Sequence, residues 1–334
     1  MTSIRSGLGA RAMRPSQILI TWARHHAWAL GLLAFLVVLL LFTKGIQPRY
    51  GVPGIQGLAI SVLPLAMAAV AQSIVVIGGG IDLSIASIMA LTSVVAAVLM
   101  KGQTEEFGLL IVLSILLLGL LLGAINGALI FVTRVPDIIV TLAMSFVWAG
   151  CALIVLKTPG GGAALWLKAL ISGSLGSEWI PKAAVALIVA VAIVWVPVQR
   201  TTLGLSIYAI GSDRLAAFRS GVSVGRTKIA AYALMGLFSA LGGLSLTAST
   251  GIGTPVPGPY TLLSVAAVVL GGVSLAGGRG GILGPILAVI ILSLIRTDMT
   301  FLNVDTNLAV VAQGVILIGV VMFGSFVQLR RANR

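Results

Sequence analysis

Long intervals without a charged residue are the feature that most restricts how this 334-residue chain can fold. Between Glu106 and Arg134 there are 27 such residues, and between Lys228 and Arg279 there are 50. A charge at the centre of a bilayer costs about 2.5–3.5 kcal/mol or more, and a helix needs about 20 apolar residues to cross it. With 59% hydrophobic residues, 9% charged residues and a mean hydropathy of +1.15, the chain is expected to be an integral membrane protein. This composition excludes a soluble enzyme, a disordered chain and a disulfide scaffold.

The charge-free intervals predict an all-α fold of about ten transmembrane helices. Two intervals are long enough for two helices each. Glycines from Gly78 to Gly80 divide the first of them, and a Gly/Pro-rich turn from Gly251 to Pro259 divides the second. The apolar runs are continuous rather than alternating, which argues against barrel strands. The expected helices are 27–43, 56–77, 82–100, 107–132, 136–156, 183–199, 226–249, 260–276, 281–297 and 307–327.

The chain carries a net charge of +13, and its positive residues divide unequally between the two sides of the predicted helices. With the N-terminus in the cytoplasm, 14 of the 21 Lys and Arg residues lie inside and 7 outside, with net charges of about +11 and +2. Because cytoplasmic loops carry the excess of Lys and Arg, we expect both termini to be cytoplasmic. We expect one transmembrane domain, 1–334, with cytoplasmic segments at 1–26 and 200–226. The charge excess then indicates topology rather than nucleic-acid binding.

The sequence carries no recognisable enzyme motif. It lacks the Gly-x-x-x-x-Gly-Lys-[Ser/Thr] phosphate-binding loop, the His-Glu-x-x-His zinc motif and the Gly-x-Ser-x-Gly nucleophile motif. Cys151 is the only cysteine, so neither a disulfide framework nor a metal cluster is expected. We expect no catalytic residue, metal or cofactor in this chain. Few acids fall in the predicted helices, which argues against a secondary carrier and favours a pore-forming subunit driven by another chain.

A glycine-rich stretch from Gly78 to Ser84 reads Gly-Gly-Gly-Ile-Asp-Leu-Ser. Three glycines disfavour a continuous helix there, and Asp82 or Ser84 can cap the helix that follows. One interpretation is a tight turn with a cap. The other is a broken helix that lines a pathway through the membrane.

The stretch from Arg200 to Lys228 predicts a short helix on the cytoplasmic side. Gly211 and Ser212 are expected to end the preceding helix, and Asp213 can cap a short helix at about 213–220 that ends at Gly221. Exposed arginines and apolar side chains on such a helix suit docking to a cytoplasmic partner. The alternative is a solvated loop helix with no special role.

Four stretches together carry a resemblance. From Gly79 to Leu91 the chain reads Gly-Gly-Ile-Asp-Leu-Ser-Ile-Ala-Ser-Ile-Met-Ala-Leu. From Ala209 to Val222 it reads Ala-Ile-Gly-Ser-Asp-Arg-Leu-Ala-Ala-Phe-Arg-Ser-Gly-Val, and the other two stretches are 135–142 and 271–280. These resemble the permease subunits of bacterial ATP-binding-cassette (ABC) importers of the ribose/xylose type, in the family that also includes branched-chain amino-acid permeases. The chain departs from the family pattern at Ala86, which replaces a glycine, and at Ser212-Asp213, which replace Gly-Asn.

The resemblance implies a multi-pass protein of the bacterial cytoplasmic membrane and a set of partners. Two permeases, identical or different, would form the pore, and a periplasmic or lipoprotein binding protein would deliver the substrate. A cytoplasmic ABC ATPase, which binds the ATP and magnesium, would dock on the coupling segment. The residues expected to couple to it are Gly211, Ser212, Asp213, Arg214, Ala216, Ala217, Ser220 and Gly221.

The resemblance favours a monosaccharide or related polyol as substrate. The same machinery carrying a branched-chain amino acid or a nucleoside is one alternative, and a secondary carrier is another. A sugar path needs a few polar groups among apolar walls, and the candidates are Asp82, Ser84, Asn126 and Thr141. Each of the last three has a structural alternative: a helix cap, a bond between helices, and a bond to its own backbone.

Arg296 and Asp298 stand near the outer end of the ninth predicted helix, where the family often carries uncharged residues. Two residues apart on a helix, they are not expected to face each other. We predict that they lie at the outer mouth and that Arg296 contacts the binding protein or an acidic substrate. The alternative is an arginine that extends its charge to the membrane interface.

Overall fold

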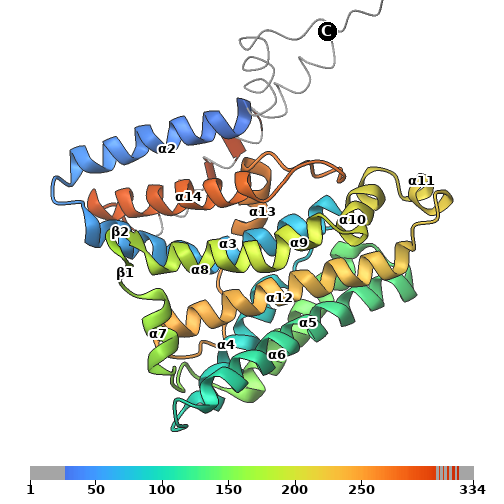
Figure 1. Ribbon diagram of the computed structural model, residues 1–334, viewed down its shortest axis with the longest axis horizontal. Coiled ribbons are helices and arrows are strands. Elements are labelled where there is room, and N and C mark those ends of the chain that lie inside the picture. Colours follow the sequence, from blue (N-terminus) through green and yellow to red (C-terminus); the bar gives the residue numbers. More distant parts are fainter. Residues whose placement is uncertain are drawn as a thin grey trace, which may run out of the picture.

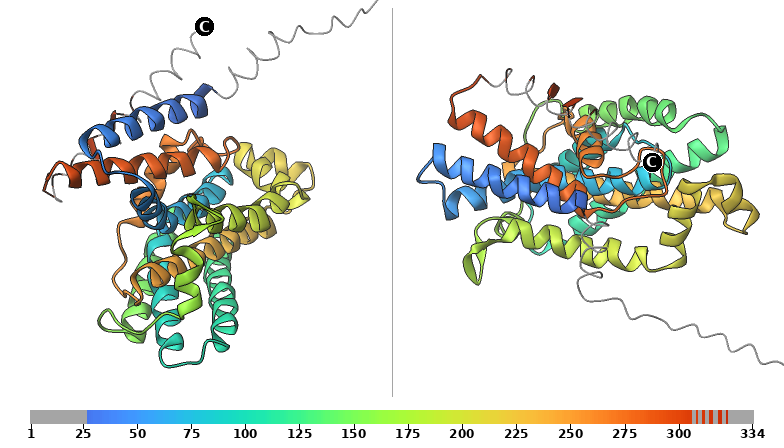
Figure 2. Two further views of the ribbon diagram at one scale, coloured as in Figure 1. Left: turned by 60° about the vertical axis from the view of Figure 1, so that its left-hand side comes forward. Right: turned by 90° about the horizontal axis from the view of Figure 1, so that it is seen from above.

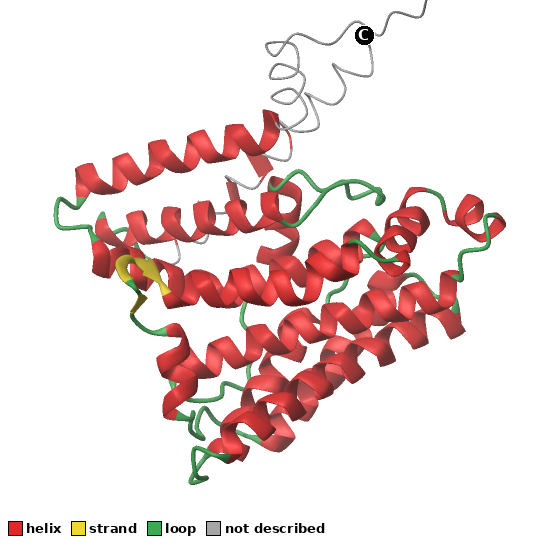
Figure 3. Ribbon diagram, in the orientation of Figure 1, coloured by secondary structure: helices red, strands yellow, loops and turns green. Residues whose placement is uncertain are grey.

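The computed structural model describes residues 27–305 and seven single positions between 308 and 322. It is a helical bundle with one small hairpin (Figures 1 and 3). In chain order the elements are α2 (Ala27–Ile46), α3 (Val52–Ile77), α4 (Ile85–Met100), α5 (Phe107–Thr133), α6 (Asp137–Val155), α7 (Leu165–Ile171), β1 (Ser174–Leu175), β2 (Ser177–Pro181), α8 (Lys182–Ala190), the π-helix η1 (Val191–Trp195), α9 (Val196–Gln199), α10 (Thr202–Ser212), α11 (Arg214–Arg219), α12 (Val224–Thr250), α13 (Tyr260–Leu270) and α14 (Leu283–Phe301).

Seven helical runs in the described part of the chain are long and apolar enough to cross a membrane. They correspond to seven of the ten predicted helices, and α8, η1 and α9 together form one of them. The predicted helices 82–100 and 260–276 are shorter than expected, since α4 begins at Ile85 and α13 ends at Leu270. The predicted helix 307–327 and the segment 1–26 lie almost entirely outside the described residues.

Helix α3 occupies the centre of the bundle. Its residues from Val62 to Ile77 are all buried, and it packs against α12, α14, α13 and α8. Helix α12 packs along the length of α5, where Gly119, Gly123 and Gly127 lie against it. A Cβ on Gly123 would collide with the carbonyl oxygen of Tyr232, so this close approach of two helices requires glycine.

The long helices run between two ends of the bundle (Figure 1). Helix α11 lies at one end, which we call the α11 end, and α7 with the β1–β2 hairpin lies at the other, which we call the hairpin end (Figures 1 and 2). The hairpin pairs Leu175 with Ser177 in antiparallel register and was not expected from the sequence. The predicted inner charges of α11 and the predicted outer charge Lys168 of α7 therefore lie at opposite ends.

Candidate functional site

A cluster of fully buried polar side chains lies where the chain enters α4. The backbone N–H and the hydroxyl of Ser84 each donate to Asp82 Oδ1 at 2.6 Å. Asn126 of α5 donates from Nδ2 to Ser84 Oγ at 2.7 Å and to Asp82 Oδ2 at 3.4 Å. All three side chains are 0% exposed. Three of the four candidate pathway residues thus form one network, which we call the polar cluster.

Two further side chains complete the polar cluster. Trp148 of α6 donates from Nε1 to Asn126 Oδ1 at 3.2 Å. The side-chain amide of Gln72 faces the backbone of Asp82. In the amide orientation that pairs both groups, its nitrogen donates to the Asp82 carbonyl at 2.9 Å and its oxygen accepts from the Asp82 N–H at 3.3 Å. Among the described residues no cation lies within ion-pair distance of Asp82. The buried carboxyl group is therefore held by uncharged donors alone.

Thr141, the fourth candidate, fixes the same loop to α6. Its hydroxyl accepts from the backbone N–H of Leu83 at 3.0 Å and donates to the carbonyl of Asp137, one turn back on its own helix, at 2.9 Å. The sequence-based alternatives for Asn126 and Thr141, a bond between helices and a bond to the local backbone, both occur. For Ser84 the expected side-chain cap of the next helix is absent, and its hydroxyl points to Asp82 instead.

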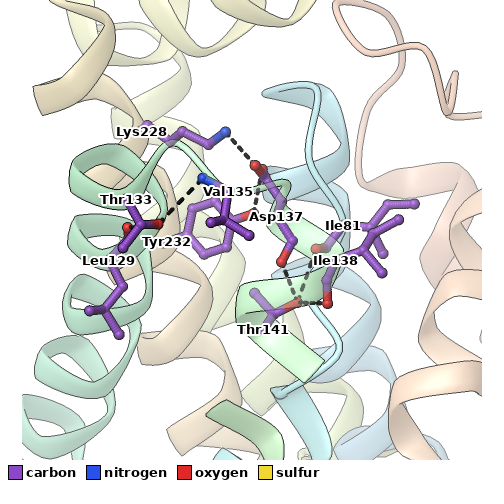
Figure 4. A network of polar contacts seen from close by, with 9 residues as sticks. All are labelled: Ile81, Leu129, Thr133, Val135, Asp137, Ile138, Thr141, Lys228 and Tyr232. Atoms are coloured by element: carbon purple, nitrogen blue, oxygen red, sulfur yellow. Dashed lines mark hydrogen bonds and ion pairs between the residues drawn. The ribbon is translucent and has the colours of Figure 1, made fainter. Parts of the chain in front are cut away.

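An ion pair of Asp137 and Lys228 lies on the same side of α6 as Thr141 and faces Ile81 of the loop before α4 (Figure 4). Lys228 Nζ of α12 is 2.6 Å from Asp137 Oδ1, and both side chains are largely buried, with 13% and 14% of their surface exposed. Tyr232 donates from its hydroxyl to Asp137 Oδ2 at 2.7 Å. A Cβ on Gly80 would collide with this carboxylate. The loop before α4 therefore packs directly against the pair.

Three glycine-bearing segments, two loops and the end of helix α10, meet at the α11 end. The N–H of Gly278 donates to the carbonyl of Ile77, the last residue of α3, at 2.8 Å. Gly211 of α10 lies against both groups, and a Cβ there would collide with the carbonyl oxygen of Ile77. Gly79, with φ +78°, lies against Gly211. We call this contact of residues 77–79, 211–212 and 277–278 the glycine junction.

Tyr208 also joins α10 to the loop of the late glycine motif. Its hydroxyl donates to the carbonyl of Gly280 at 3.0 Å. Burial raises the pKa of the Tyr208 phenol, so the group remains a protonated donor at neutral pH. The predicted docking segment is thereby linked through the glycine junction to the loop that carries Asp82.

Helix α11 has the caps that the sequence predicts. Asp213 Oδ1 accepts from the N–H groups of Leu215 and Ala216, both at 2.9 Å. The N–H of Gly221 donates to the carbonyl of Phe218, and that of Val222 to the carbonyl of Ala217, which is a Schellman ending. Gly211 and Ser212 were expected to end the preceding helix, and α10 does end there, with Ser212 as its last residue.

The coupling candidates divide into buried and exposed residues. Gly211 and Ala217 are buried, and Ala217 packs with Ile210 and Val224 in a small apolar cluster. The others are exposed, namely Ser212, Asp213, Arg214, Ala216, Ser220 and Gly221. Leu215 and Phe218 expose 57% and 66% of their surface.

A hollow of about 670 Å³ lies between α11, the end of α5 and the start of α12. Its lining combines apolar side chains with two arginines and comprises Phe131, Val132, Arg134, Arg214, Leu215, Phe218, Ser223, Val224 and Gly225. The α11 end thus presents an apolar concavity edged by positive charge.

Arg296 and Asp298 do not form one site. Arg296 is exposed, whereas Asp298 is 3% exposed and neither of its carboxyl oxygens has a hydrogen-bond partner among the described residues. The geometry therefore supports a surface role for Arg296 alone. No group of three or more His, Cys, Asp or Glu side chains that could hold a metal occurs within the described ranges.

The partners of the candidate residues were not found from the sequence. Trp148, Lys228 and Tyr232 lie 22, 91 and 95 residues from their partners, and Gln72 lies on α3, the helix before the loop, so no spacing within one helix indicates them. The positions of the charges could have indicated the ion pair. Asp137 begins α6 and Lys228 lies in the first turns of α12, and both helix ends are expected on the cytoplasmic side of the membrane.

Comparison with known proteins gives concordant matches. Residues 54–321 match the family described as branched-chain amino acid transport system / permease component. The chain is 33% identical to the ribose import permease protein RbsC of Bacillus subtilis (strain 168) over 289 residues, 85% of this chain and 88% of that protein. It is 32% identical to the fructose import permease protein FrcC of Rhizobium meliloti over 260 residues, 74% and 71% of the two chains.

A third relative is the autoinducer 2 import system permease protein LsrD of Escherichia coli O9:H4 (strain HS). The identity is 29% over 320 residues, which cover 92% of this chain and 94% of that protein. No solved structure matches the chain.

Proposed function

Because the chain belongs to the family of branched-chain amino acid transport system permease components, and is a permease of the ABC sugar importer type, we propose that it forms the pathway for uptake of a monosaccharide or related polyol. It is a multi-span protein of the bacterial cytoplasmic membrane and not itself an ATPase. The observation that carries the substrate class is the 33% identity to a ribose import permease over 88% of that protein. A branched-chain amino acid or nucleoside is the alternative cargo, and the family description names the former.

We propose that a cytoplasmic ABC ATPase docks at the α11 end. The exposed side chains of Leu215 and Phe218 and the adjoining hollow offer an apolar contact. Arg134 and Arg214 line this hollow, and Arg219 is exposed at the end of α11, so the matching ATPase surface should be acidic. ATP and magnesium would bind in that partner. A second permease, identical or different, and a substrate-binding protein at the hairpin end complete the proposed importer.

Asp82, Ser84, Asn126 and Thr141 are the proposed pathway residues. In this structure all four residues are 0% exposed, and Thr141 also accepts a hydrogen bond from the loop that precedes α4. The glycine junction connects that loop to the docking segment. When the ATPase moves α11, α10 would transmit the movement through the glycine junction to the loop. Displacement of the loop would then expose the buried polar groups to substrate.

Reconstitution tests the proposed function. The permease, its neighbouring ATPase and its neighbouring binding protein are placed in vesicles, and uptake of radiolabelled D-ribose, D-fructose and L-leucine is compared with and without ATP. We expect ATP-dependent uptake of a sugar that the binding protein also binds, detected by a rise in its melting temperature. Uptake of leucine alone would establish the alternative cargo, and uptake by the permease without its partners would establish a secondary carrier.

A further inference from the structure

The exposed face of α14 changes character along its length. Toward the α11 end it is apolar, with Leu283, Ile286, Leu287 and Ile290. Toward the hairpin end it is polar, with Ser293, Arg296, Thr297 and Thr300 at helical spacing i, i+3, i+4 and i+7. The opposite face is buried in the bundle throughout. The hydroxyls of Thr297 and Thr300 each donate to a backbone carbonyl one turn back, at 3.0 Å, so Arg296 is the group on this half that lipid tails cannot satisfy.

Irregular backbone lies in the same part of the molecule. Gly253 pairs with Gly160 and packs against Val94 and Ala97 near the hairpin end of α4. Thr261 accepts from the N–H of Ala86 at the other end of α4. The chain from 254 to 260 therefore runs beside α4 for about 16 Å, at 1.5 Å per helical residue.

Several side chains of this irregular segment are exposed, namely Thr254, Val256 and Pro259. Backbone outside helices and closed barrels occurs at membrane depth only where protein covers it or where it lines water. This segment leads into α13, which begins at Tyr260 and packs against α14, so the segment and the polar half of α14 belong to neighbouring elements. Together they form one surface that requires water or a ligand.

Arg296 is the only charged residue on the exposed face of α14. Within the described ranges, no acidic side chain lies within ion-pair distance of it, and Asp298 is buried on another face. A guanidinium group binds carboxylates and phosphates through paired hydrogen bonds. Ser293, three residues before it on the same helix, carries a hydroxyl that suits a sugar or polyol, and the hydroxyl of Thr297, which donates to the Ser293 carbonyl, keeps an oxygen that can accept.

We propose that this surface lines a water-filled part of the transport pathway and that Arg296 selects substrates bearing a negative charge, such as a sugar acid or sugar phosphate. The inference rests on the proposed function and narrows its substrate class. It places Arg296 in contact with substrate during passage, rather than with lipid.

Cysteine accessibility tests the water-filled surface. In a Cys151→Ala background, Ser293→Cys and Arg296→Cys are compared with Leu113→Cys, which lies on the exposed apolar stripe of α5 at a similar distance from its helix end. The complete importer is reconstituted in neutral phosphatidylcholine vesicles and treated with a membrane-impermeant sulfonate thiol reagent. We expect cysteines at 293 and 296 to react and the cysteine at 113 to remain unmodified. If positions 293 and 296 are as unreactive as 113, the surface faces lipid or protein and the proposal is wrong.

Ligand protection tests the charge selection without depending on the binding protein. Modification of Ser293→Cys is measured with D-ribonate, D-ribose 5-phosphate or neutral D-ribose present, at matched ionic strength in sodium chloride. We expect the two anions to slow the reaction about tenfold, as one charge-assisted contact would, and ribose to have little effect. Protection should be lost in Arg296→Gln and retained in part in Arg296→Lys.

The two anions show which charged group the site prefers on its substrate. Protection by D-ribonate alone identifies a carboxylate, and protection by D-ribose 5-phosphate alone identifies a phosphate. Equal protection by ribose, or protection that persists in Arg296→Gln, would overturn the role of Arg296. Failure of the proposed function has a different signature, because it abolishes ATP-driven uptake by the importer while leaving accessibility and anion protection unchanged.

Discussion

Asn126 joins three parts of the bundle through one side chain. From α5 it donates to Ser84 before α4 and accepts from Trp148 of α6. Each of these groups is buried, so water cannot replace a lost partner. A buried donor or acceptor without a partner costs about 1–3 kcal/mol, which makes this residue important for stability whatever its part in transport.

Replacing Asn126 with Ala should lower the stability of the detergent-solubilised protein by about 1–3 kcal/mol, because Trp148 Nε1 and Ser84 Oγ would each lose a partner. Thermal unfolding followed by intrinsic fluorescence measures the effect. Ser114→Ala on the same helix is the matched control, since its exposed hydroxyl bonds only the carbonyl of Leu110. Equal melting temperatures for the two variants would contradict the role of the polar cluster.

The pair of Asp137 and Lys228 makes a second prediction at this scale. Lys228→Met removes the cation and leaves a largely buried carboxylate with Tyr232 as its side-chain donor. We expect a loss on the order of 3 kcal/mol. The double variant Asp137→Asn with Lys228→Met should recover most of it, because no uncompensated charge remains. Additive losses in the double variant would show that the pair is not coupled.

At the residue scale, the sequence indicated the candidates but not their partners. Asp82, Ser84, Asn126 and Thr141 were selected by the family resemblance and by position, and they gather around one loop. Tyr232 is 95 residues from Asp137 and Trp148 is 22 residues from Asn126. Such contacts depend on how helices pack, which periodicity within one helix does not specify. Their part in transport stays a prediction.

At the scale of elements, the glycine junction explains how a change at α11 can be felt inside the bundle. Helix α10 contacts the end of α3 and the late glycine loop with its backbone, so no flexible side chain intervenes. Close-packed contacts of this kind are bistable rather than continuously deformable. Helix α10 and the loop before α4 should therefore move together.

Gly211→Ala should uncouple ATP hydrolysis from transport. Its Cβ would collide with the Ile77 carbonyl and force α10 away from α3. In reconstituted importer we expect uptake per ATP hydrolysed to fall by about tenfold or more, with misfolded protein removed by size-exclusion chromatography. Gly150→Ala on α6, where a Cβ meets open space, is the control and should behave as the unmodified protein. Normal coupling in Gly211→Ala would refute the linkage.

The sequence predicted most helices because a helix that crosses the membrane requires a long interval without charged residues. It overestimated the predicted helices 82–100 and 260–276, where α4 begins at Ile85 and α13 ends at Leu270. At 271–276 the reason is physical, because glycine-rich backbone that folds back inside the protein is as free of charge as a helix, whereas residues 82–84 form a loop in which Ser84 bonds Asp82. The hairpin and α7 lie between predicted helices, where no apolar period marks them.

At the scale of the whole molecule, the positive charges assigned to the two sides of the membrane lie at opposite ends of the bundle. The arginines of α11 lie at one end and Lys168 of α7 at the other, as the division of charges between two sides requires. Which end faces the cytoplasm follows from the excess of positive charge and is a prediction. The α11 end also carries the hollow proposed for the ATPase. The proposed docking site therefore requires the predicted orientation, with the α11 end in the cytoplasm.

Cysteine labelling in whole cells tests this orientation. In a Cys151→Ala background, Trp179→Cys in the hairpin and Phe218→Cys in α11 provide exposed positions at the two ends, with 61% and 66% of the native side chains exposed. A membrane-impermeant maleimide added outside should modify position 179 and leave 218 unmodified until the cells are opened, since the hairpin end faces outward. In opened membranes the ATPase should protect 218 but not 179, because it covers α11. Labelling of 218 from outside would invert the topology, and labelling of 218 unaffected by the ATPase would remove α11 from the interface.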